Sequence, residues 1–316
     1  VRILCNFPIN HVACTGDICS WVLVAGGAIV FMETFDPAAT LDAIERERLN
    51  VWGGVPTMLQ LCVGVPDFDR RDLSSVEFVL WSGAASPRPL LDRLSRLGAK
   101  LATSYGMTET TGSVTYSDPG ADLDTLAETI GRPHPAYEVR LTGEDGRPCA
   151  VGEEGEIQVR GDFIMLGYFG RPEATAAAID ADGWLHTGDV AVAREDGNWR
   201  IVGRRSQMYK SGGFNVYPRE IELALEGHPA VAMATVVPLP DPLYQEVGCA
   251  FVVPRGDAEP SEDELRQFLR ERLANYKVPK RLFVRRELPM LPVGKVDRVR
   301  LTADAARMVG HSAGAS

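Results

Sequence analysis

Ser104-Tyr105-Gly106-Met107-Thr108-Glu109-Thr110 is the stretch from which the rest of the chain is best interpreted. Residues 100–103 before it predict a short strand, so the stretch lies at the carboxyl edge of a sheet, where α/β folds place ligands. The Tyr105 ring can stack on a base, the Thr108 hydroxyl can bond a phosphate, and the Glu109 carboxylate can hold Mg²⁺. The stretch therefore predicts a loop that binds a nucleotide and a metal ion. Taken alone, it could also be a polar turn that begins a helix.

The sequence around this stretch alternates strands with helices. Residues 51–55 and 76–80 are short apolar runs, residues 87–97 are helical in pattern, and Asp36-Pro37 supplies an N-cap followed by proline in a first helical turn. This alternation predicts a parallel sheet covered on both faces over residues 1–124. Residues 18–32 are apolar but short and interrupted by two glycines, which predicts a buried helix and a buried strand and excludes a membrane span.

The pattern changes twice further along the chain. Residues 125–203 alternate apolar and polar positions between Asp-Gly turns, which predicts an antiparallel β subdomain, arranged as a small barrel or sandwich. Residues 204–309 predict a separate α+β domain, in which Ser261 and Glu264 form a capping box. The last residues, 310–316, are expected to be a disordered tail.

Composition excludes several classes of protein. The formal net charge is -10 and the pI is about 5.1, which argues against nucleic acid as the main partner. The six cysteines contain no CxxC pair, so we expect reduced thiols and a cytoplasmic protein rather than a disulfide framework. The five histidines are scattered and form no Cys/His cluster, which makes a structural zinc site improbable.

Three later segments accompany the first stretch in a fixed order. They are Thr187-Gly188-Asp189, the segment from Gly203-Arg204 to Pro218, and Pro292-Val293-Gly294-Lys295. Together they resemble the adenylate-forming superfamily, which includes acyl- and aryl-CoA synthetases, adenylation domains of peptide synthetases, and firefly luciferase. The resemblance covers residues 7–298 and implies an α/β large domain with a small antiparallel β subdomain, followed by a mobile α+β lid domain.

The resemblance implies roles for individual residues. Catalysis falls to Lys295, Thr108 and Glu109, and Glu109 is also the metal ligand. Lys295 would stabilise charge on the carboxylate and α-phosphate as pyrophosphate leaves. The nucleotide-binding residues that it implies are Gly83, Ala84, Ala85, Ser104, Tyr105, Gly106, Thr108, Asp189 and Arg204.

The remaining implied positions serve CoA, the acid and the hinge. Ser211, Gly212 and Gly213 would line the channel of the CoA pantetheine arm, where a side chain would block the path. The acyl pocket would include His11, Gly53, Gly54 and Met107, although His11 could equally be a satisfied core residue. Ser206 stands at the hinge position, where the family generally carries Asp or Lys.

One feature of the family is missing from the chain. We find no Ser/Thr/Gly-rich loop ending in Lys, which in the family holds the β- and γ-phosphates of ATP, and the chain begins on Val1 inside an apolar segment. We therefore expect an amino-terminally truncated, carboxyl-terminal portion of an ATP-dependent acyl-CoA synthetase, with a lean toward fatty or medium-chain acids. The alternatives are an adenylation domain that loads a carrier protein and an inactive nucleotide-binding fragment. The sequence does not predict which individual carboxylic acid is the substrate, nor the oligomeric state.

Overall fold

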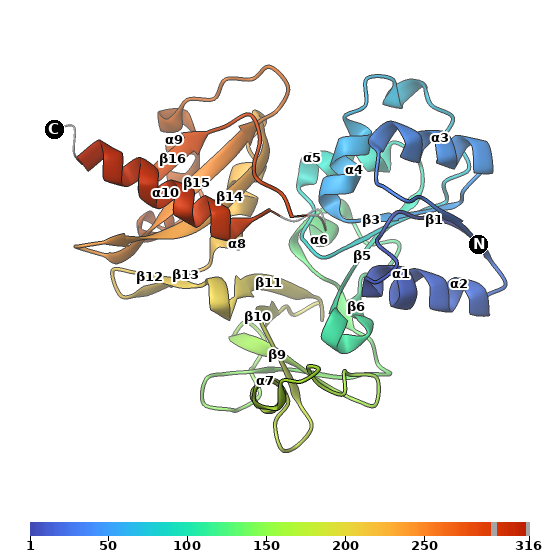
Figure 1. Ribbon diagram of the computed structural model, residues 1–316, viewed down its shortest axis with the longest axis horizontal. Coiled ribbons are helices and arrows are strands. Elements are labelled where there is room, and N and C mark those ends of the chain that lie inside the picture. Colours follow the sequence, from blue (N-terminus) through green and yellow to red (C-terminus); the bar gives the residue numbers. More distant parts are fainter. Residues whose placement is uncertain (292–295, 314–316) are drawn as a thin grey trace. The chain divides into compact units, whose positions relative to one another are not determined.

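The computed structural model describes residues 1–291 and 296–313, with side chains described as far as residue 308. The chain divides into two compact units, Val1–Ile201 and Val202–Ser316, close to the boundary expected after residue 203 (Figure 1). The α/β residues 1–124 and the β-rich residues that follow them lie in the same unit. Each unit has its own apolar core.

In the described part of the first unit, seven strands form one sheet in the order β2-β1-β3-β4-β5-β6-β7. The strands are β1 (Arg2–Cys5), β2 (Ala28–Phe31), β3 (Val51–Gly54), β4 (Phe78–Ser82), β5 (Lys100–Met107), β6 (Gly112–Tyr116) and β7 (Arg132–Pro133). The first five strands in this order, β2, β1, β3, β4 and β5, are parallel, as the alternation predicted. Strands β6 and β7 pair antiparallel to their neighbours. The predicted parallel sheet over residues 1–124 is therefore wrong for β6, because Thr111, with φ 58°, reverses the chain after β5 and the turn that follows it.

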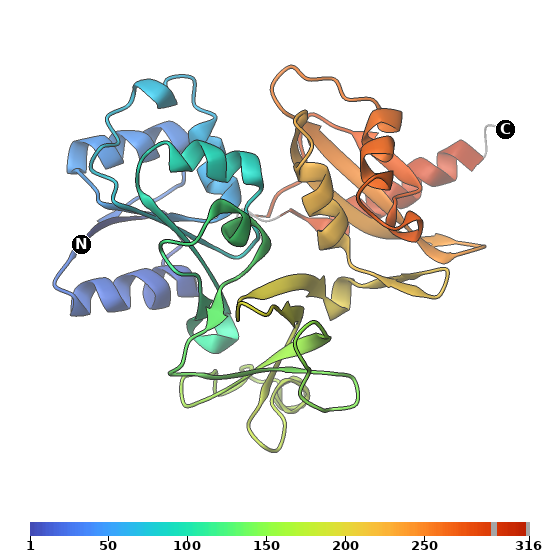
Figure 2. The same ribbon diagram turned by 180° about the vertical axis from the view of Figure 1, so that it is seen from behind.

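Helices cover both faces of this sheet (Figures 1 and 2). One face carries α3 (Pro37–Glu47), α4 (Pro56–Val63), α5 (Arg88–Ser95) and α6 (Leu123–Glu128), with the short 3₁₀ turn η2 (Phe68–Arg70). The other face carries α1 (Val12–Cys14), the π-helical turn η1 (Thr15–Ser20) and α2 (Trp21–Val24). The helix predicted at Asp36-Pro37 is confirmed, since the Asp36 carboxylate accepts the Ala39 amide at 2.7 Å.

Residues 18–32 differ from the expectation of a buried helix and a buried strand. Ile18 and Val22 are buried against β1, but Leu23 is 67% exposed and Val24 is 91% exposed. Phe31 is also exposed, because β2 lies at the sheet's edge and pairs with β1 on one side. Burial therefore reaches only the helix face that points toward the sheet.

The β-rich part is an antiparallel sheet in the order β11-β10-β9-β8. Its elements are β8 (Glu138–Thr142), β9 (Glu154–Arg160), α7 (Pro172–Ala178), β10 (Leu185–Ala193) and β11 (Trp199–Arg204). Over the described residues the sheet stays open, with β8 and β11 at its two edges, so the prediction of a barrel or sandwich was wrong. A second sheet is not needed because Ile157 and Val159 of β9 share a core with Tyr105 and Val114 of the α/β sheet.

The second unit is an α+β fold around one sheet. The strands are β12 (Tyr209–Ser211), β13 (Phe214–Val216), β14 (Val231–Asp241), β15 (Gln245–Pro254) and β16 (Arg281–Val284), and the helices are α8 (Pro218–Glu226), α9 (Glu262–Arg270) and α10 (Arg298–Ala313), with 3₁₀ turns η4 (Arg205–Gln207) and η5 (Asn275–Lys277). Helices α8 and α9 pack on one face, and α10 packs on the other. The predicted capping box is confirmed, because Ser261 and Glu264 bond each other's backbone amides at 3.1 and 3.3 Å.

Helix α10 corrects the expected disordered tail. It continues to Ala313, so residues 310–313 are helical, and residues 314–316 lie outside the described part of the chain. Leu301 and Ala305 are fully buried against the sheet, and this packing outweighs the roughly 1 kcal/mol by which Gly310 disfavours a helix.

Two further predictions concern the whole chain. Each of the six cysteines has a free thiol in the structure, four of them buried, and the absence of a disulfide framework stays a prediction. Among the described residues, the structure holds no helix that is both long and apolar enough to cross a membrane.

Candidate functional site

The carboxyl ends of three neighbouring parallel strands bring most of the predicted site residues of the first unit to one edge. Gly54 of β3 pairs with Trp81 of β4, and Ser82 of β4 pairs with Ser104 of β5. The chain leaves these strands through Gly53 and Gly54, through Gly83, Ala84 and Ala85, and through Ser104 to Met107. This edge is where parallel sheets present backbone and side-chain groups to ligands.

Tyr105 and Asp189 meet at this edge although 84 residues separate them in sequence. The Tyr105 hydroxyl donates to Asp189 Oδ2 at 2.7 Å, and both residues are buried. The Asp189 amide donates to Thr187 Oγ1 at 3.1 Å, and the Thr187 hydroxyl donates to the Ile157 carbonyl at 2.7 Å. The structure therefore joins the two sequence segments that were predicted to bind a nucleotide; their nucleotide role itself stays a prediction.

The turn that carries Asp189 is held by a carboxylate that the sequence did not single out. Glu156 of β9 is buried, and its Oε1 accepts the Gly188 amide at 3.0 Å. Its Oε2 lies 3.0 Å from His186 Nδ1. His186 thus supports the turn from the side. A glutamate within a β-strand gives no sequence signal for such a role.

Thr108 and Glu109 form the 3₁₀ turn η3 (Thr108–Thr110), which follows β5 directly. The Met107 amide donates to Thr110 Oγ1 at 2.9 Å and closes the turn. The Thr108 side chain lies on the outside of this turn and is exposed. Glu109 Oε1 accepts the hydroxyl of Tyr168 at 2.9 Å. Tyr168 was missed, because nothing in the run around it predicts contact with a residue 59 positions earlier.

Glu109 offers an oxygen ligand that suits Mg²⁺. Among the described residues, no group of three or more His, Cys, Asp or Glu side chains could hold a metal ion. Mg²⁺ in nucleotide sites commonly takes one or two protein carboxylates, with phosphate oxygens and waters completing its octahedron. A single carboxylate at this edge therefore fits a metal that arrives with a nucleotide, and does not fit a resident metal cage.

Close packing of backbone explains the glycine in the predicted loop. A Cβ at Gly106 would lie 2.0 Å from the Gly112 carbonyl oxygen, so any side chain would push β5 and β6 apart. Next to it, the Ser104 and Ser113 hydroxyls lie 3.0 Å apart. These contacts fix the two strands that carry the loop.

Asp17 is a second residue that the sequence did not select. It comes from η1, and its Oδ1 accepts the Ser113 amide at 3.1 Å. Burial raises the pKa of this carboxyl above its ordinary value, and the hydrogen bonds from Ser113 partly oppose that shift. Burial likewise raises the pKa of the neighbouring Tyr116 to about 12.

His11 has a local structural role. It is the N-cap of α1, and its Nδ1 accepts the Ala13 amide at 3.1 Å. Its ring also stacks on Phe7, with centroids 6.2 Å apart. These contacts account for the histidine without a ligand, so its place in an acyl pocket stays a prediction.

The second unit carries the other predicted positions. Arg204 ends β11, and Ser206 lies in η4. Ser211 ends β12, and Gly212 and Gly213 form the two-residue loop to β13, with φ of 58° and 88°. Two successive positive φ angles define a hairpin turn that favours glycine at both places. Lys295 lies outside the described residues.

Comparison with known proteins identifies relatives for both units. A family model described as "AMP-binding enzyme" matches residues 1–169, and one described as "AMP-binding enzyme C-terminal domain" matches residues 220–295. A feruloyl-CoA synthase of Amycolatopsis sp is 41% identical over 93% of this chain and 60% of that protein. The medium/long-chain-fatty-acid–CoA ligase FadD8 of Mycobacterium tuberculosis is 36% identical over 98% of this chain and 56% of that protein.

Solved structures give the same result. The amide bond synthetase McbA from Marinactinospora thermotolerans matches with a TM-score of 0.87 and 34% identity, over 96% of this chain and 61% of that one. An o-succinylbenzoate CoA synthetase from Bacillus subtilis, in complex with its acyl-adenylate intermediate, matches with a TM-score of 0.82 and 32% identity, over 95% of this chain and 60% of that one. The chain thus spans about 60% of the length of these relatives.

Proposed function

Because the chain belongs to the AMP-binding enzyme family, we propose that it serves an ATP-dependent acyl-CoA synthetase and carries that enzyme's adenosine, ribose and lid residues. The observation that carries the proposal is the 2.7 Å contact between Tyr105 and Asp189 at the carboxyl edge of the sheet. An aromatic ring and a carboxylate this close can contact a base and its ribose at the same time.

The proposed reaction has two halves. A carboxylate oxygen of the acid attacks the α-phosphorus of ATP, the bond to the β-phosphate oxygen breaks, and pyrophosphate leaves. The CoA thiol sulfur then attacks the acyl carbon, loses its proton to solvent, and AMP leaves with the electrons of the acyl–oxygen bond. Both halves use the same bound adenosine, so residues that hold it act throughout.

The chain's own residues take separate tasks in this proposal. Tyr105 stacks on adenine, Asp189 accepts hydrogen bonds from the ribose hydroxyls, and Arg204 contacts the ribose and nearby phosphate. Thr108 donates to the α-phosphate, and Lys295 stabilises the charge that develops as pyrophosphate leaves. The adenine is bordered by small residues and backbone, from Gly83, Ala84, Ala85, Ser104 and Gly106.

A divalent metal fits the proposal at one residue. Glu109 would hold Mg²⁺, which, when bound with the nucleotide, neutralises phosphate charge. The metal therefore needs only one carboxylate from the chain, because the nucleotide brings its other oxygen ligands.

The remaining positions serve CoA, the acid and the hinge. For the second half-reaction, the Gly212–Gly213 loop would admit the pantetheine arm of CoA, with Ser211 beside it. Ser206 would be the hinge residue, and the acid would be bordered by His11, Gly53, Gly54 and Met107. Six free thiols favour a reducing compartment, so we place the reaction in the cytoplasm.

The acid is proposed to be a fatty or medium-chain carboxylic acid. The name of FadD8 supports this class, whereas the name of the feruloyl-CoA synthase points to an aromatic acid. A panel of aliphatic and aryl acids, scored by pyrophosphate release with ATP and CoA, separates the two. Higher kcat/KM for every aryl acid than for any aliphatic acid would overturn the proposed class.

The test of the proposed function separates the two half-reactions. Lys295→Ala should lower acyl-adenylate formation about 10²–10³-fold, since one preorganised charge is typically worth that much. The same variant should convert a supplied acyl-adenylate to the thioester at the unaltered rate. Lys100→Ala is the matched control, because Lys100 is exposed at the amino end of β5, away from the carboxyl edge.

The outcomes distinguish the alternatives. Equal loss of both half-reactions in Lys295→Ala would refute the role given to the lysine. Transfer to a carrier protein but not to free CoA would instead favour a carrier-loading adenylation domain. Binding of AMP without any pyrophosphate exchange by the 316-residue chain would favour an inactive nucleotide-binding module.

A further inference from the structure

A tyrosine outside the predicted site holds the proposed metal ligand. Tyr168 lies in the loop between β9 and α7, and its hydroxyl donates to Glu109 Oε1 at 2.9 Å. A hydrogen bond to an ionised carboxylate is shorter and stronger than one between neutral groups. The contact therefore restricts which way the Glu109 carboxylate faces.

The same loop also holds the backbone around Glu109. The Met165 amide donates to the Glu109 carbonyl at 2.8 Å, and the Thr111 hydroxyl donates to the Phe163 carbonyl. Both the main chain and the side chain of Glu109 are thus bonded to one short segment. Such double attachment fixes a side chain more firmly than the turn η3 alone could.

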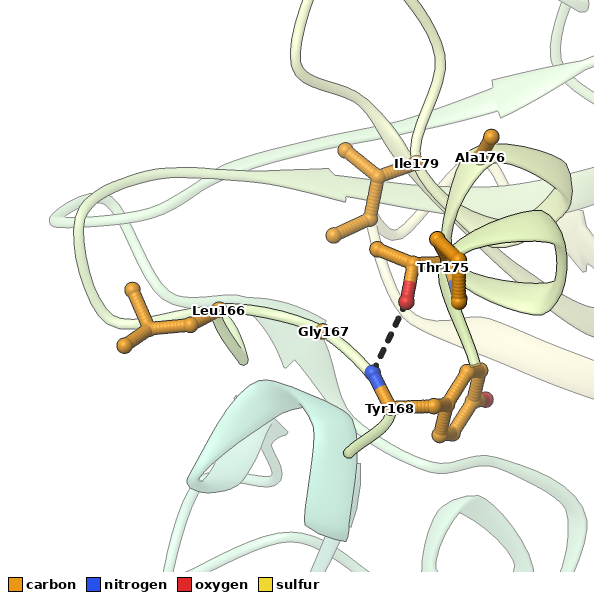
Figure 3. A pocket seen from close by; sticks show the side chains of 7 residues that line it. Leu166, Gly167, Tyr168, Thr175, Ala176 and Ile179 are labelled. Carbon is orange, nitrogen blue, oxygen red and sulfur yellow. Dashed lines mark hydrogen bonds between the residues drawn. The ribbon is translucent and has the colours of Figure 1, made fainter. Parts of the chain in front are cut away.

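Tyr168 is in turn fixed by α7, as Figure 3 shows. Its amide donates to Thr175 Oγ1 at 2.9 Å, and the Thr175 hydroxyl is 3.0 Å from the Arg171 carbonyl. Gly167, with φ 146°, allows this approach, because a Cβ there would lie 2.7 Å from Thr175 Cγ2. The path from α7 to Glu109 therefore consists of consecutive short contacts.

We propose that Tyr168 is a positioning residue for Glu109, which orients the carboxylate toward a nucleotide-bound divalent cation. The inference rests on the proposed function, since that function gives Glu109 its metal. Groups that hydrogen-bond a metal ligand typically change metal affinity about 10–100-fold when they are removed. Tyr168 is 39% exposed, so solvent can replace part of its effect, and we expect about a 3- to 10-fold change.

The test measures metal binding directly rather than turnover. Mn²⁺, a spectroscopic substitute for Mg²⁺, is titrated into the full chain in the presence of a non-hydrolysable ATP analogue and followed by electron paramagnetic resonance. Tyr168→Phe, which removes only the hydroxyl, should raise the Mn²⁺ dissociation constant about 3- to 10-fold. Metal-free binding of the analogue should not change.

Two further variants make the result decisive. Phe169→Leu is the matched control, because Phe169 is the fully exposed neighbour and should leave Mn²⁺ binding unchanged. Glu109→Gln tests the proposed metal ligand itself. If Glu109→Gln weakens Mn²⁺ binding and Tyr168→Phe does not, the positioning role is wrong and the proposed function stands. If Glu109→Gln has no effect, the proposed metal role is wrong.

Discussion

Glu222 of α8 gives the sharpest prediction for the second unit. Its side chain is only 1% exposed, and it lies 2.7 Å from Arg298 Nη2 and 3.4 Å from Arg219 Nη1. It also accepts the Val236 amide at 2.9 Å. One carboxylate therefore joins α8, β14 and the first residue of α10.

Removing this carboxylate leaves two cations and an amide without it. Arg219 keeps Glu226 at 3.1 Å, and the Arg219 and Arg298 side chains are 20% and 29% exposed, so Glu226 and water replace the lost partner only in part. Breaking a buried pair from one side costs about 3–5 kcal/mol, and we expect Glu222→Ala to fall in this range. Glu222→Gln keeps an oxygen for the Val236 amide and should cost about 1–3 kcal/mol.

Hydrogen exchange measures this loss in the second unit alone. All five tryptophans lie in the first unit, so their fluorescence does not follow unfolding of the second. Exchange of β14 amides by mass spectrometry should accelerate about 10²- to 4 × 10³-fold in Glu222→Ala, since about 1.4 kcal/mol corresponds to tenfold. Exchange in β4 should not change.

The matched control is Glu220→Ala on the same helix. Glu220 bonds Lys277 Nζ at 2.7 Å, but the two side chains are 28% and 21% exposed and a single pair is lost. Partly exposed pairs contribute about 0–1 kcal/mol, so exchange should rise less than about tenfold. Equal effects of Glu220→Ala and Glu222→Ala would refute the reasoning that burial of the network sets the cost.

Three further predictions concern the first unit. Tyr105→Phe should lower the unfolding free energy of the first unit by about 1.5–3 kcal/mol, because the buried Asp189 carboxylate loses a hydrogen-bond donor. Urea unfolding followed by tryptophan fluorescence measures this free energy, and a decrease of less than about 0.5 kcal/mol would contradict the prediction. The pKa of Asp17 is raised in the folded protein above its ordinary value of 3.8. The stability that the protonated Asp17 contributes is therefore fully present below pH 3.8 and is lost as the pH rises through the folded-state pKa. Asp17→Asn keeps a hydrogen-bond acceptor for the Ser113 amide but has no charge to bury. The urea midpoint of the variant should therefore exceed that of the unaltered protein by more at about pH 7 than at about pH 4.5, and an equal difference at the two pH values would contradict the prediction. Burial raises the pKa of Cys62 to about 12, so alkylation of this thiol at about pH 8 should be at least about 10²-fold slower in native than in unfolded protein, as measured by mass spectrometry.

Local features of the fold were predictable because their physics is local. The N-cap at Asp36 and the capping box of Ser261 and Glu264 each depend on residues within one turn, and the structure confirms both. The reversal at Thr111 and the exposure of β2 depend instead on what lies beside them in space. No pattern of neighbouring residues reports such contacts, so these two predictions failed.

The candidate site shows the same limit. The sequence selected Tyr105 and Asp189 separately, and the structure adds that they touch. Tyr168 and Glu156 were missed because each acts through a contact across 59 and 32 residues, respectively. The roles of the selected residues in nucleotide binding stay predictions, and the prediction for Lys295 falls outside the described residues.

These contacts indicate that the β-rich sheet orients the edge of the α/β sheet. Strand β5 fixes where the backbone of Tyr105 ends, but several rotamers remain open to a long side chain. Asp189 from β10 selects one for Tyr105, and Tyr168 from the loop after β9 selects one for Glu109. Substitutions in the β-rich part should therefore alter the site without touching the strands of the α/β sheet, since the two parts share an apolar core and lie in one compact unit.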